Sequence, residues 1–292
     1  MSNPRAEYSP ITNRQPLRLP GNARVAVWIV INVEEWAFDA PMPRGILTAP
    51  QGRSFVPDVP NFAWAEYGLR VGFWRMKEVL DRYQVKATVA LNASVCNTYP
   101  QLVEAVVKDG WEILGHGYVQ RALPAEEDEE GVIRRSIQLL KEKTGRTPRG
   151  WLGPGLAETY NTLDILARAG IEYVCDWVND DQPYRLKVKE GTLYSVPYTL
   201  ELNDITLYLK EHQRPPELLE RAQEHLETLN REGATNARVM AIGTHPHLMG
   251  VPHRIGYFQR LVDYLKQHEG VLLMTGSQVL DWYKQVTGEG KR

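Results

Sequence analysis

Two kinds of apolar pattern alternate along the chain: short, nearly continuous apolar runs, and longer stretches with apolar residues at helical spacing. The first run, Val25–Val33, is almost wholly apolar and mostly β-branched. It predicts a strand that is buried on both faces, which favours a parallel sheet. Similar, shorter runs predict further strands at 87–91, 111–115, 150–152, 173–175, 192–196, 239–244 and 271–274.

Helical spacing follows most of these runs. It predicts helices from residue 68 onward and at 100–109, 126–145, about 163–170, 215–232, 255–268 and 277–286. Because strands and helices alternate without a dividing linker, we expect one (β/α)-barrel-like domain. A doubly wound sheet is the competing layout, but no glycine-rich phosphate loop follows the first strand.

Two proline-rich segments lie outside this alternation. Residues 1–22 are polar and predict an N-terminal arm, either loose or laid on a neighbouring subunit, with 23–292 as a single barrel domain. Residues 37–66 show little periodicity. Since so long a structureless insert is unusual unless it is functional, we expect a loop folded over the site.

Composition narrows the setting. The chain has 292 residues, of which 43% are hydrophobic, and a formal net charge of −2. These values give no reason to expect a nucleic acid or a membrane surface as partner. Cys96 and Cys175 are far apart in apolar contexts and are expected to be reduced, and the first 20 residues contain no secretory signal. We therefore expect a cytoplasmic protein.

Ionisable residues end three of the predicted strands. Glu34 and Glu35 close the first strand, where strand alternation turns only one of them into a barrel mouth unless the backbone leaves the strand conformation. His116 ends the third strand between two glycines. A histidine four residues later would complete a metal pair, but that position is Gln120, a poor zinc ligand. We expect the three strand ends to meet in one site.

The third group of ionisable residues follows the seventh predicted strand. It contains His245, His247, His253 and Arg254. His245 comes directly after the strand, and an imidazole suits acid–base work near neutral pH, so we expect it to be the catalytic one. The others are candidates for substrate binding or helix capping. Asp176 could orient a histidine or cap a turn, whereas 203–204 is interpreted as a polar turn.

The order of these stretches resembles the polysaccharide deacetylase (carbohydrate esterase 4) superfamily, whose pattern this sequence follows from about 24 to 280. That family has a carboxylate pair after strand one, a His-x-x-x-His metal motif, an Arg/Pro loop, an Asp/Trp element and a late histidine. The matching stretches are 33–36, 115–120, 151–155, 176–177 and His245. The resemblance implies a distorted (β/α) barrel of about seven strands. It also implies a metal site at Glu35, His116 and Gln120.

Two departures point to a side branch of that superfamily. The second metal histidine is Gln120, and Leu152 stands about where the arginine is expected. The stretches 179–184, 196–199 and 250–254 look more like allantoinase-like and cyclic-imidase-like members. The resemblance implies that some of these hydrolyse a cyclic amide bond without a bound metal.

Three functions follow as hypotheses. The first is hydrolysis of a small cyclic amide or imide, without a cofactor, in which Glu34 or Glu35 is the base and His245 the acid. His116 would stabilise the oxyanion or complete a weak metal site. The substrate would be bound by Trp36, Trp151, Asp176, Trp177, His247, His253 and Arg254.

The second hypothesis is metal-dependent N-deacetylation of an acetylated amino sugar or peptidoglycan fragment. One divalent metal, zinc, would be held by Glu35, His116 and either Gln120 or a histidine of the 245–253 stretch. The third hypothesis is a catalytically silent binding protein, motivated by the loss of a histidine at Gln120. In each case we expect a homo-oligomer with a small-molecule ligand.

Overall fold

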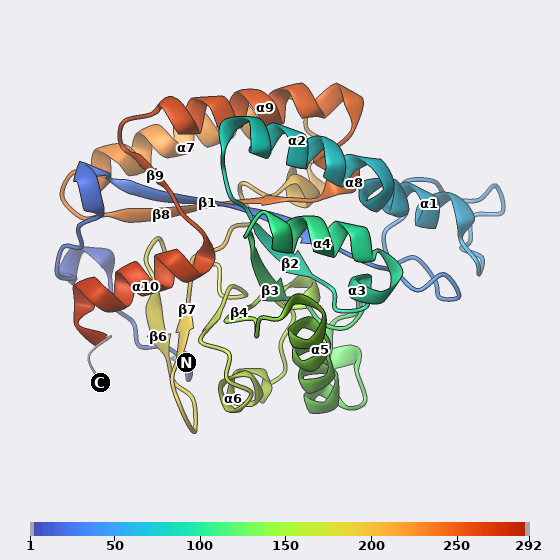
Figure 1. The fold of residues 1–292 in the computed structure, drawn as a ribbon, viewed down its shortest axis with the longest axis horizontal. Coiled ribbons are helices and arrows are strands. Elements are labelled where there is room, and N and C mark those ends of the chain that lie inside the picture. The colour runs from blue at the N-terminus through green and yellow to red at the C-terminus, as the bar shows by residue number, and fades with distance from the viewer. Residues whose placement is uncertain (1–2, 290–292) are drawn as a thin grey trace.

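The computed structural model describes residues 3–289, whose nine strands form one sheet that curls into an open barrel with helices on its outside (Figure 1). This confirms the expected α/β, barrel-like fold class. The strands are β1 (Val25–Val33), β2 (Thr88–Leu91), β3 (Glu112–Gly115), β4 (Gly150–Trp151), β5 (Tyr173–Val174), β6 (Tyr184–Leu186), β7 (Leu193–Ser195), β8 (Arg238–Thr244) and β9 (Val271–Leu273).

β1 pairs with three strands of this sheet, whose strand order is β6-β7-β5-β4-β3-β2-β1-β8, with β9 off this path and paired to β1. It pairs in parallel with β8 along Val25–Ile31, with β9 at its start and with β2 from Val30 to Val33. Every pairing is parallel except that of β6 with β7. The carboxyl ends of the parallel strands therefore meet at one edge of the barrel.

Both faces of β1 are buried, which explains its unbroken apolar run. Trp28 and Val30 pack inside the barrel in a cluster with residues of β5, β7 and β8. Val27 and Ile29 pack on the outside, in a cluster with α2, α7 and α9. Since side chains alternate along a strand, even-numbered residues of β1 point inward.

The helices match the predicted alternation closely. They are α1 (Val59–Tyr67), α2 (Phe73–Tyr83), α3 (Val95–Thr98), α4 (Pro100–Lys108), α5 (Glu129–Thr144), α6 (Thr162–Arg168), α7 (Glu217–Gly233), α8 (Pro246–Met249), α9 (Pro252–Gln267) and α10 (Gly276–Thr287). Two π-helical segments, η3 (Gly68–Gly72) and η6 (Ile205–Lys210), also occur. In Figure 1, α2, α7 and α9 lie together over β1 and β8.

One local expectation differs from the structure. The end of the segment 37–66, expected as a loop, is helical, and α1 has Pro60 in its first turn, where the missing N–H costs nothing. Two short elements gave no clear pattern in the sequence: β6, which adds an antiparallel edge, and η6.

The N-terminal arm lies along its own chain. Arg5 pairs with the buried Asp164 at 2.8 Å, and Arg14 pairs with Asp180 at 2.5 Å. Nearer the barrel, the Leu17 backbone accepts from Ala237 N at 3.0 Å. The arm is therefore not loose, and its contact with a neighbouring subunit stays a prediction.

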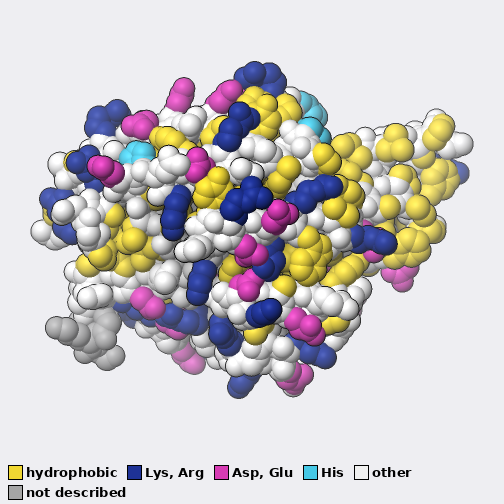
Figure 2. All heavy atoms as spheres, turned by 45° about the horizontal axis from the view of Figure 1, so that its top comes forward, with side chains coloured by type: hydrophobic (Ala, Val, Ile, Leu, Met, Phe, Trp, Pro, Cys, Tyr) yellow, Lys and Arg dark blue, Asp and Glu magenta, His cyan; other side chains and the backbone are white. Residues whose placement is uncertain are grey.

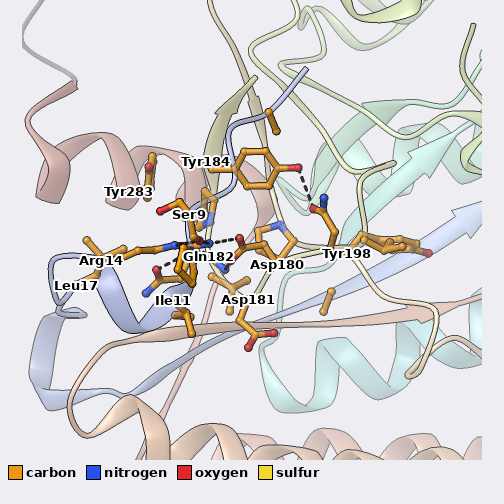
Figure 3. A pocket seen from close by; sticks show the side chains of 18 of the residues that line it. Ser9, Ile11, Arg14, Leu17, Asp180, Asp181, Gln182, Tyr184, Tyr198 and Tyr283 are labelled. Carbon is orange, nitrogen blue, oxygen red and sulfur yellow. Dashed lines mark hydrogen bonds and ion pairs between the residues drawn. The ribbon is translucent and has the colours of Figure 1, made fainter. Parts of the chain in front are cut away.

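The arm borders a cavity of about 1430 Å³ on the side of the barrel that is open between the edge strands β6 and β8 (Figure 3). Arg14, Asp180 and Gln182 are hydrogen-bonded at its wall. A single bridge between Asn203 and Gly243 connects this open side to β8. None of the strand-end groups Glu34, His116 and His245 lines the cavity.

Residues 37–58 form a loop that projects from the body together with α1 (Figure 1). Asn61 of α1 holds the loop, since its side chain accepts from Ile46 N and Leu47 N at 2.8 and 3.0 Å. Hydrophobic side chains gather on this projection (Figure 2). The exposed ones are Phe38, Ile46, Leu47, Phe55, Val56 and Val59.

Candidate active site

The ends of β1, β3 and β8 bring Glu34, His116 and His245 together. Glu34 Oε1 lies 3.3 Å from Nε2 of His245 and 3.8 Å from Nε2 of His116. All three side chains are buried. Glu34 continues the inward-facing register of β1 two residues after Asn32, so its carboxylate points into the barrel mouth.

His245 lies between two carboxylates. Its Nδ1 is 2.6 Å from Asp204 Oδ1, and its backbone N–H donates to Asp204 Oδ2 at 2.6 Å. Because a carboxylate only accepts, Nδ1 carries a proton and Nε2 faces Glu34. Burial lowers the pKa of His245, but the charges of Asp204 and Glu34 outweigh it and raise the pKa to about 9. The ring is therefore an imidazolium at neutral pH.

Glu34 is the anionic partner of that imidazolium. Burial favours its neutral form, but the charge of His245 and a hydrogen bond from the same ring hold the pKa well below its ordinary value. Arg44, from the projecting loop, acts in the same direction. Gln120 Nε2 donates to Oε1 at 2.7 Å, while Oε2 is buried without a hydrogen-bond partner.

His116 has a fixed orientation. Its Nδ1 lies 2.5 Å from the carbonyl oxygen of Leu152, which can only accept, so Nδ1 carries the proton. In the neutral ring, Nε2 is then an unprotonated acceptor. That atom is buried, faces Glu34 and has no hydrogen-bond partner. It is available to hold a water or another ligand next to the Glu34 carboxylate.

Glu35 and Gln120 do not form the predicted metal set with His116. Gln120 turns its amide N–H toward Glu34, and its Oε1 accepts from Asn92 Nδ2 at 3.2 Å. Glu35 follows in the opposite register to Glu34, and its backbone N–H donates to Asn92 Oδ1 at 2.8 Å. Among residues 3–289, no group of three or more His, Cys, Asp or Glu side chains is arranged to hold a metal ion.

The substrate-binding candidates of the middle strands lie in different surroundings. Trp151 is fully buried on the helix side of β4, packed with α5 and α6. Asp176 accepts from Gly153 N at 2.7 Å at the barrel edge. Trp177 donates from Nε1 to Glu158. Trp36 is half-buried where the chain leaves β1.

The substrate-binding candidates after β8 also lie in different surroundings. His247 is buried in α8 with its ring 5.8 Å from that of His245 and 4.8 Å from that of Trp64. Burial, together with the charge of His245, lowers its pKa to about 3, so it stays neutral. Arg254 stacks over Tyr208 at 4.2 Å. His253 is exposed at the start of α9.

Sequence reasoning missed Asp204. The turn interpretation fits Asn203, whose Oδ1 accepts from Ile205 N at 3.0 Å. The Asp204 carboxylate instead has no exposed surface and bonds His245 twice. Asn32 was missed as well, although it lies on the same face of β1 as Glu34 and was therefore open to prediction from strand alternation.

Known proteins resemble this chain over most of its length. The polysaccharide deacetylase family matches residues 66–174. A Schizosaccharomyces pombe protein named "Putative polysaccharide deacetylase" is 28% identical, over 89% of this chain and 90% of its own. The structure of a "probable Polysaccharide deacetylase" of Pseudomonas aeruginosa PAO1 is 26% identical, with a TM-score of 0.84 over 94% of this chain and 95% of that one.

An allantoinase structure, "Puue Allantoinase", is 25% identical, with a TM-score of 0.82 over 96% of this chain and 98% of its own. The chain is thus similar to members of the polysaccharide deacetylase superfamily, as the order of its motifs predicted. It is a hydrolase of carbon–nitrogen bonds other than peptide bonds.

Proposed function

We propose that the protein hydrolyses a small cyclic amide or imide, with Glu34 as general base and His245 as general acid. The observation that carries this proposal is the position of His245 between Asp204 and Glu34, at 2.6 and 3.3 Å. A protonated imidazole and an ionised carboxylate in contact are the two groups that amide hydrolysis needs. Likeness to an allantoinase over nearly the whole chain supports the cyclic substrate.

The proposed reaction has two proton transfers. A water held between Glu34 and the Nε2 atom of His116 attacks the carbonyl carbon and gives a proton to the Glu34 carboxylate. The oxygen of the tetrahedral intermediate is stabilised by the nearby imidazolium. His245 then protonates the leaving nitrogen, the carbon–nitrogen bond breaks, and the ring opens to a carboxylic acid and an amine (from a cyclic amide) or an amide (from an imide). After these two transfers, the proton on Glu34 passes to His245, which restores the starting state.

The two transfers are coupled through charge. While His245 is protonated, Glu34 is a weak base because the imidazolium lowers its pKa. When His245 gives its proton to the leaving nitrogen, that attraction disappears and burial of Glu34 dominates. Glu34 therefore holds the proton it took from water more firmly once His245 has given up its own, which favours the forward direction.

A substrate panel tests this proposal. Purified, chelator-treated protein is assayed with allantoin, hydantoins, succinimides and N-acetylated amino sugars, beside Glu34→Gln and His245→Gln variants. We expect turnover of at least one cyclic amide that both substitutions abolish. No turnover of any cyclic amide, together with zinc-restored turnover of an N-acetyl sugar, would refute it.

The names of the deacetylase relatives support a second candidate, metal-dependent N-deacetylation of an acetylated amino sugar or peptidoglycan fragment. The unpartnered Nε2 of His116 is the atom that such a metal would use. The side chains of Glu35 and Gln120 do not fit that role as they lie. Metal analysis of the protein as purified separates the candidates, since near-stoichiometric zinc would favour this one.

Three further features of the setting remain our proposals. Exposed hydrophobic side chains on the 38–59 projection support a homo-oligomer. Cys96 and Cys175 are both unpaired and buried, which supports a cytoplasmic setting. No helix among residues 3–289 is long and apolar enough to cross a membrane. A silent binding protein remains the outcome expected if neither substrate class is turned over.

A further inference from the structure

One peptide group joins His116 to Asp176. The carbonyl of Leu152 accepts from Nδ1 of His116 at 2.5 Å, and the N–H of the same peptide unit, on Gly153, donates to Asp176 Oδ1 at 2.7 Å. Asp176 is thus connected to His116 by hydrogen bonds through this peptide, although the two side chains are not in contact. A chain of two hydrogen bonds through a peptide is polarised along its length, so the charge at one end strengthens the bond at the other.

Asp176 in turn faces a second carboxyl group. Its Oδ2 is buried without a donor, and the Glu158 carboxyl group lies within hydrogen-bonding reach of the Asp176 carboxyl group. The Nε1 atom of Trp177 donates to both Glu158 oxygens, at 3.1 and 3.2 Å. Among residues 3–289, Asp176 forms no ion pair with a lysine, arginine or histidine. Two ionised carboxylates in contact would repel, and a single shared proton removes that repulsion.

Burial and the neighbouring charges also favour a proton on this pair. Burial and the neighbouring charge of Glu158 raise the pKa of Asp176 well above its ordinary value. Burial raises the pKa of Glu158 to about 7, although Trp177 and Asp176 lower it by hydrogen bonding. The other titratable or charged groups that face the pair are Arg5, Glu129, Cys175 and Tyr184.

We propose that Asp176 and Glu158 share one proton and act as a positioning pair, which holds the Leu152–Gly153 peptide so that His116 keeps its proton on Nδ1 and presents Nε2 to Glu34. The pair carries one negative charge. Through Gly153 N–H that charge strengthens the Leu152 carbonyl as an acceptor, and the acceptor selects the tautomer of His116. Glu158 and Asp176 are positioning residues, since neither contacts the reacting atoms.

Infrared spectroscopy tests the shared proton. At neutral pH the wild-type protein should show the carbonyl band of a protonated carboxyl group. Glu158→Gln should lose that band, because the glutamine amide donates to Asp176 and leaves it ionised. The matched control is Glu129→Gln, which removes a neighbouring carboxylate that is already bonded by Thr159 and should leave the band in place. A wild-type spectrum without the band, or a band that survives in Glu158→Gln, would overturn the shared proton.

Nitrogen-15 NMR of histidine-labelled protein tests the positioning role, with His116→Gln used to assign the signals. The wild type and Glu158→Gln should both show His116 as the Nδ1–H tautomer. Asp176→Leu, which removes the acceptor of Gly153 N–H, should shift both His116 nitrogen signals toward a mixture of tautomers. Unchanged His116 signals in folded Asp176→Leu protein would contradict the role of the pair.

This inference rests on the proposed function only for its effect on rate, and the two measurements need no substrate. If the infrared and NMR results are as expected while no cyclic amide is hydrolysed, the pair stands and the proposed reaction fails. If a cyclic amide is hydrolysed but the band is absent, the reaction stands and the pair fails.

Discussion

Asp204 holds His245 at two points, one carboxylate oxygen on Nδ1 and the other on the backbone N–H, each at 2.6 Å. This double contact fixes both the position of the ring and the identity of its protonated nitrogen. The remaining nitrogen, Nε2, can only point toward Glu34. Asp204 therefore sets both the orientation and the charge of His245, the proposed acid, although it contacts no other residue of the proposed mechanism.

Substitution Asp204→Asn should impair the acid. Loss of the negative charge lowers the pKa of His245 from about 9, because burial is then opposed by Glu34 alone. Activity requires the imidazolium and falls as pH rises through this pKa. The basic limb of the kcat/KM profile should thus move to lower pH, with a loss of about 10²–10⁴-fold at pH 8. Asp164→Asn, a buried carboxylate paired with Arg5, is the control and should leave the limb in place.

Glu34→Gln and Glu35→Gln should differ. The Glu34 carboxylate contacts both histidines, whereas Glu35 is in the opposite register. Glu34→Gln should abolish turnover with the protein still folded by circular dichroism, and Glu35→Gln should keep most of it. The reverse order of activities would show that Glu35 is the base.

Stability should depend on pH through His245. Its folded-state pKa of about 9 exceeds its ordinary value of 6.5, so the stabilisation is complete below pH 6.5 and is lost as pH rises through 9. Urea unfolding should show a free energy of unfolding that falls across this window. The slope should vanish in His245→Gln, and a wild-type curve that is flat from pH 6.5 to 9 would contradict the shift.

Gly72→Ala should disturb the histidine segment. A Cβ at Gly72 would lie 2.1 Å from the Pro246 carbonyl oxygen, next to His245. Since the atoms that this Cβ would meet are backbone atoms, either η3 or α8 must move. We expect a lower Tm and a large loss of activity. Gly256→Ala in α9 is the matched control, because nothing lies within 4 Å of its Cβ. It should stabilise the protein by about 0.5–1 kcal/mol with unchanged activity.

Arg5→Ala should destabilise the protein without changing the chemistry. Asp164 is only 2% exposed and loses its close cationic partner, at 2.8 Å, in this variant. Lys189 remains, with its Nζ 3.7 Å from Asp164 and its backbone N–H bonded to it, so the cost should be below the about 3 kcal/mol of a buried charge left unpaired. Lys187→Ala removes the exposed pair with Glu7 and should leave the urea midpoint unchanged. Equal midpoints for both variants would show that the arm contributes nothing to stability.

The sequence was sufficient for most of the fold. The continuous apolar run of Val25–Val33 and the strand–helix alternation predicted the central strand, the parallel pairing and the catalytic edge, because these depend on local periodicity. The arm was less predictable, since its contacts with Asp164 and Asp180 depend on side chains more than 150 residues away. β6, at three residues, was too short to give a pattern.

The site was only partly predictable, and its residue roles remain proposals. Strand ends indicated Glu34, His116 and His245, and the structure brings these three together. Asp204 follows no strand and has the sequence context of a turn, so nothing local distinguished it from a solvated aspartate. Glu158 is similar, because its contact with Asp176 depends on the fold of the loop between β4 and α6.

The pairing of β1 with three other strands has an evolutionary consequence. A strand that contacts β2, β8 and β9 and is buried on both faces tolerates few replacements at any position. The carboxylate at its end is thereby inherited with an almost unchangeable segment. New substrate preferences would arise in the projecting loop at 37–58 and in the helix that anchors it, where exposed side chains can vary without disturbing the barrel.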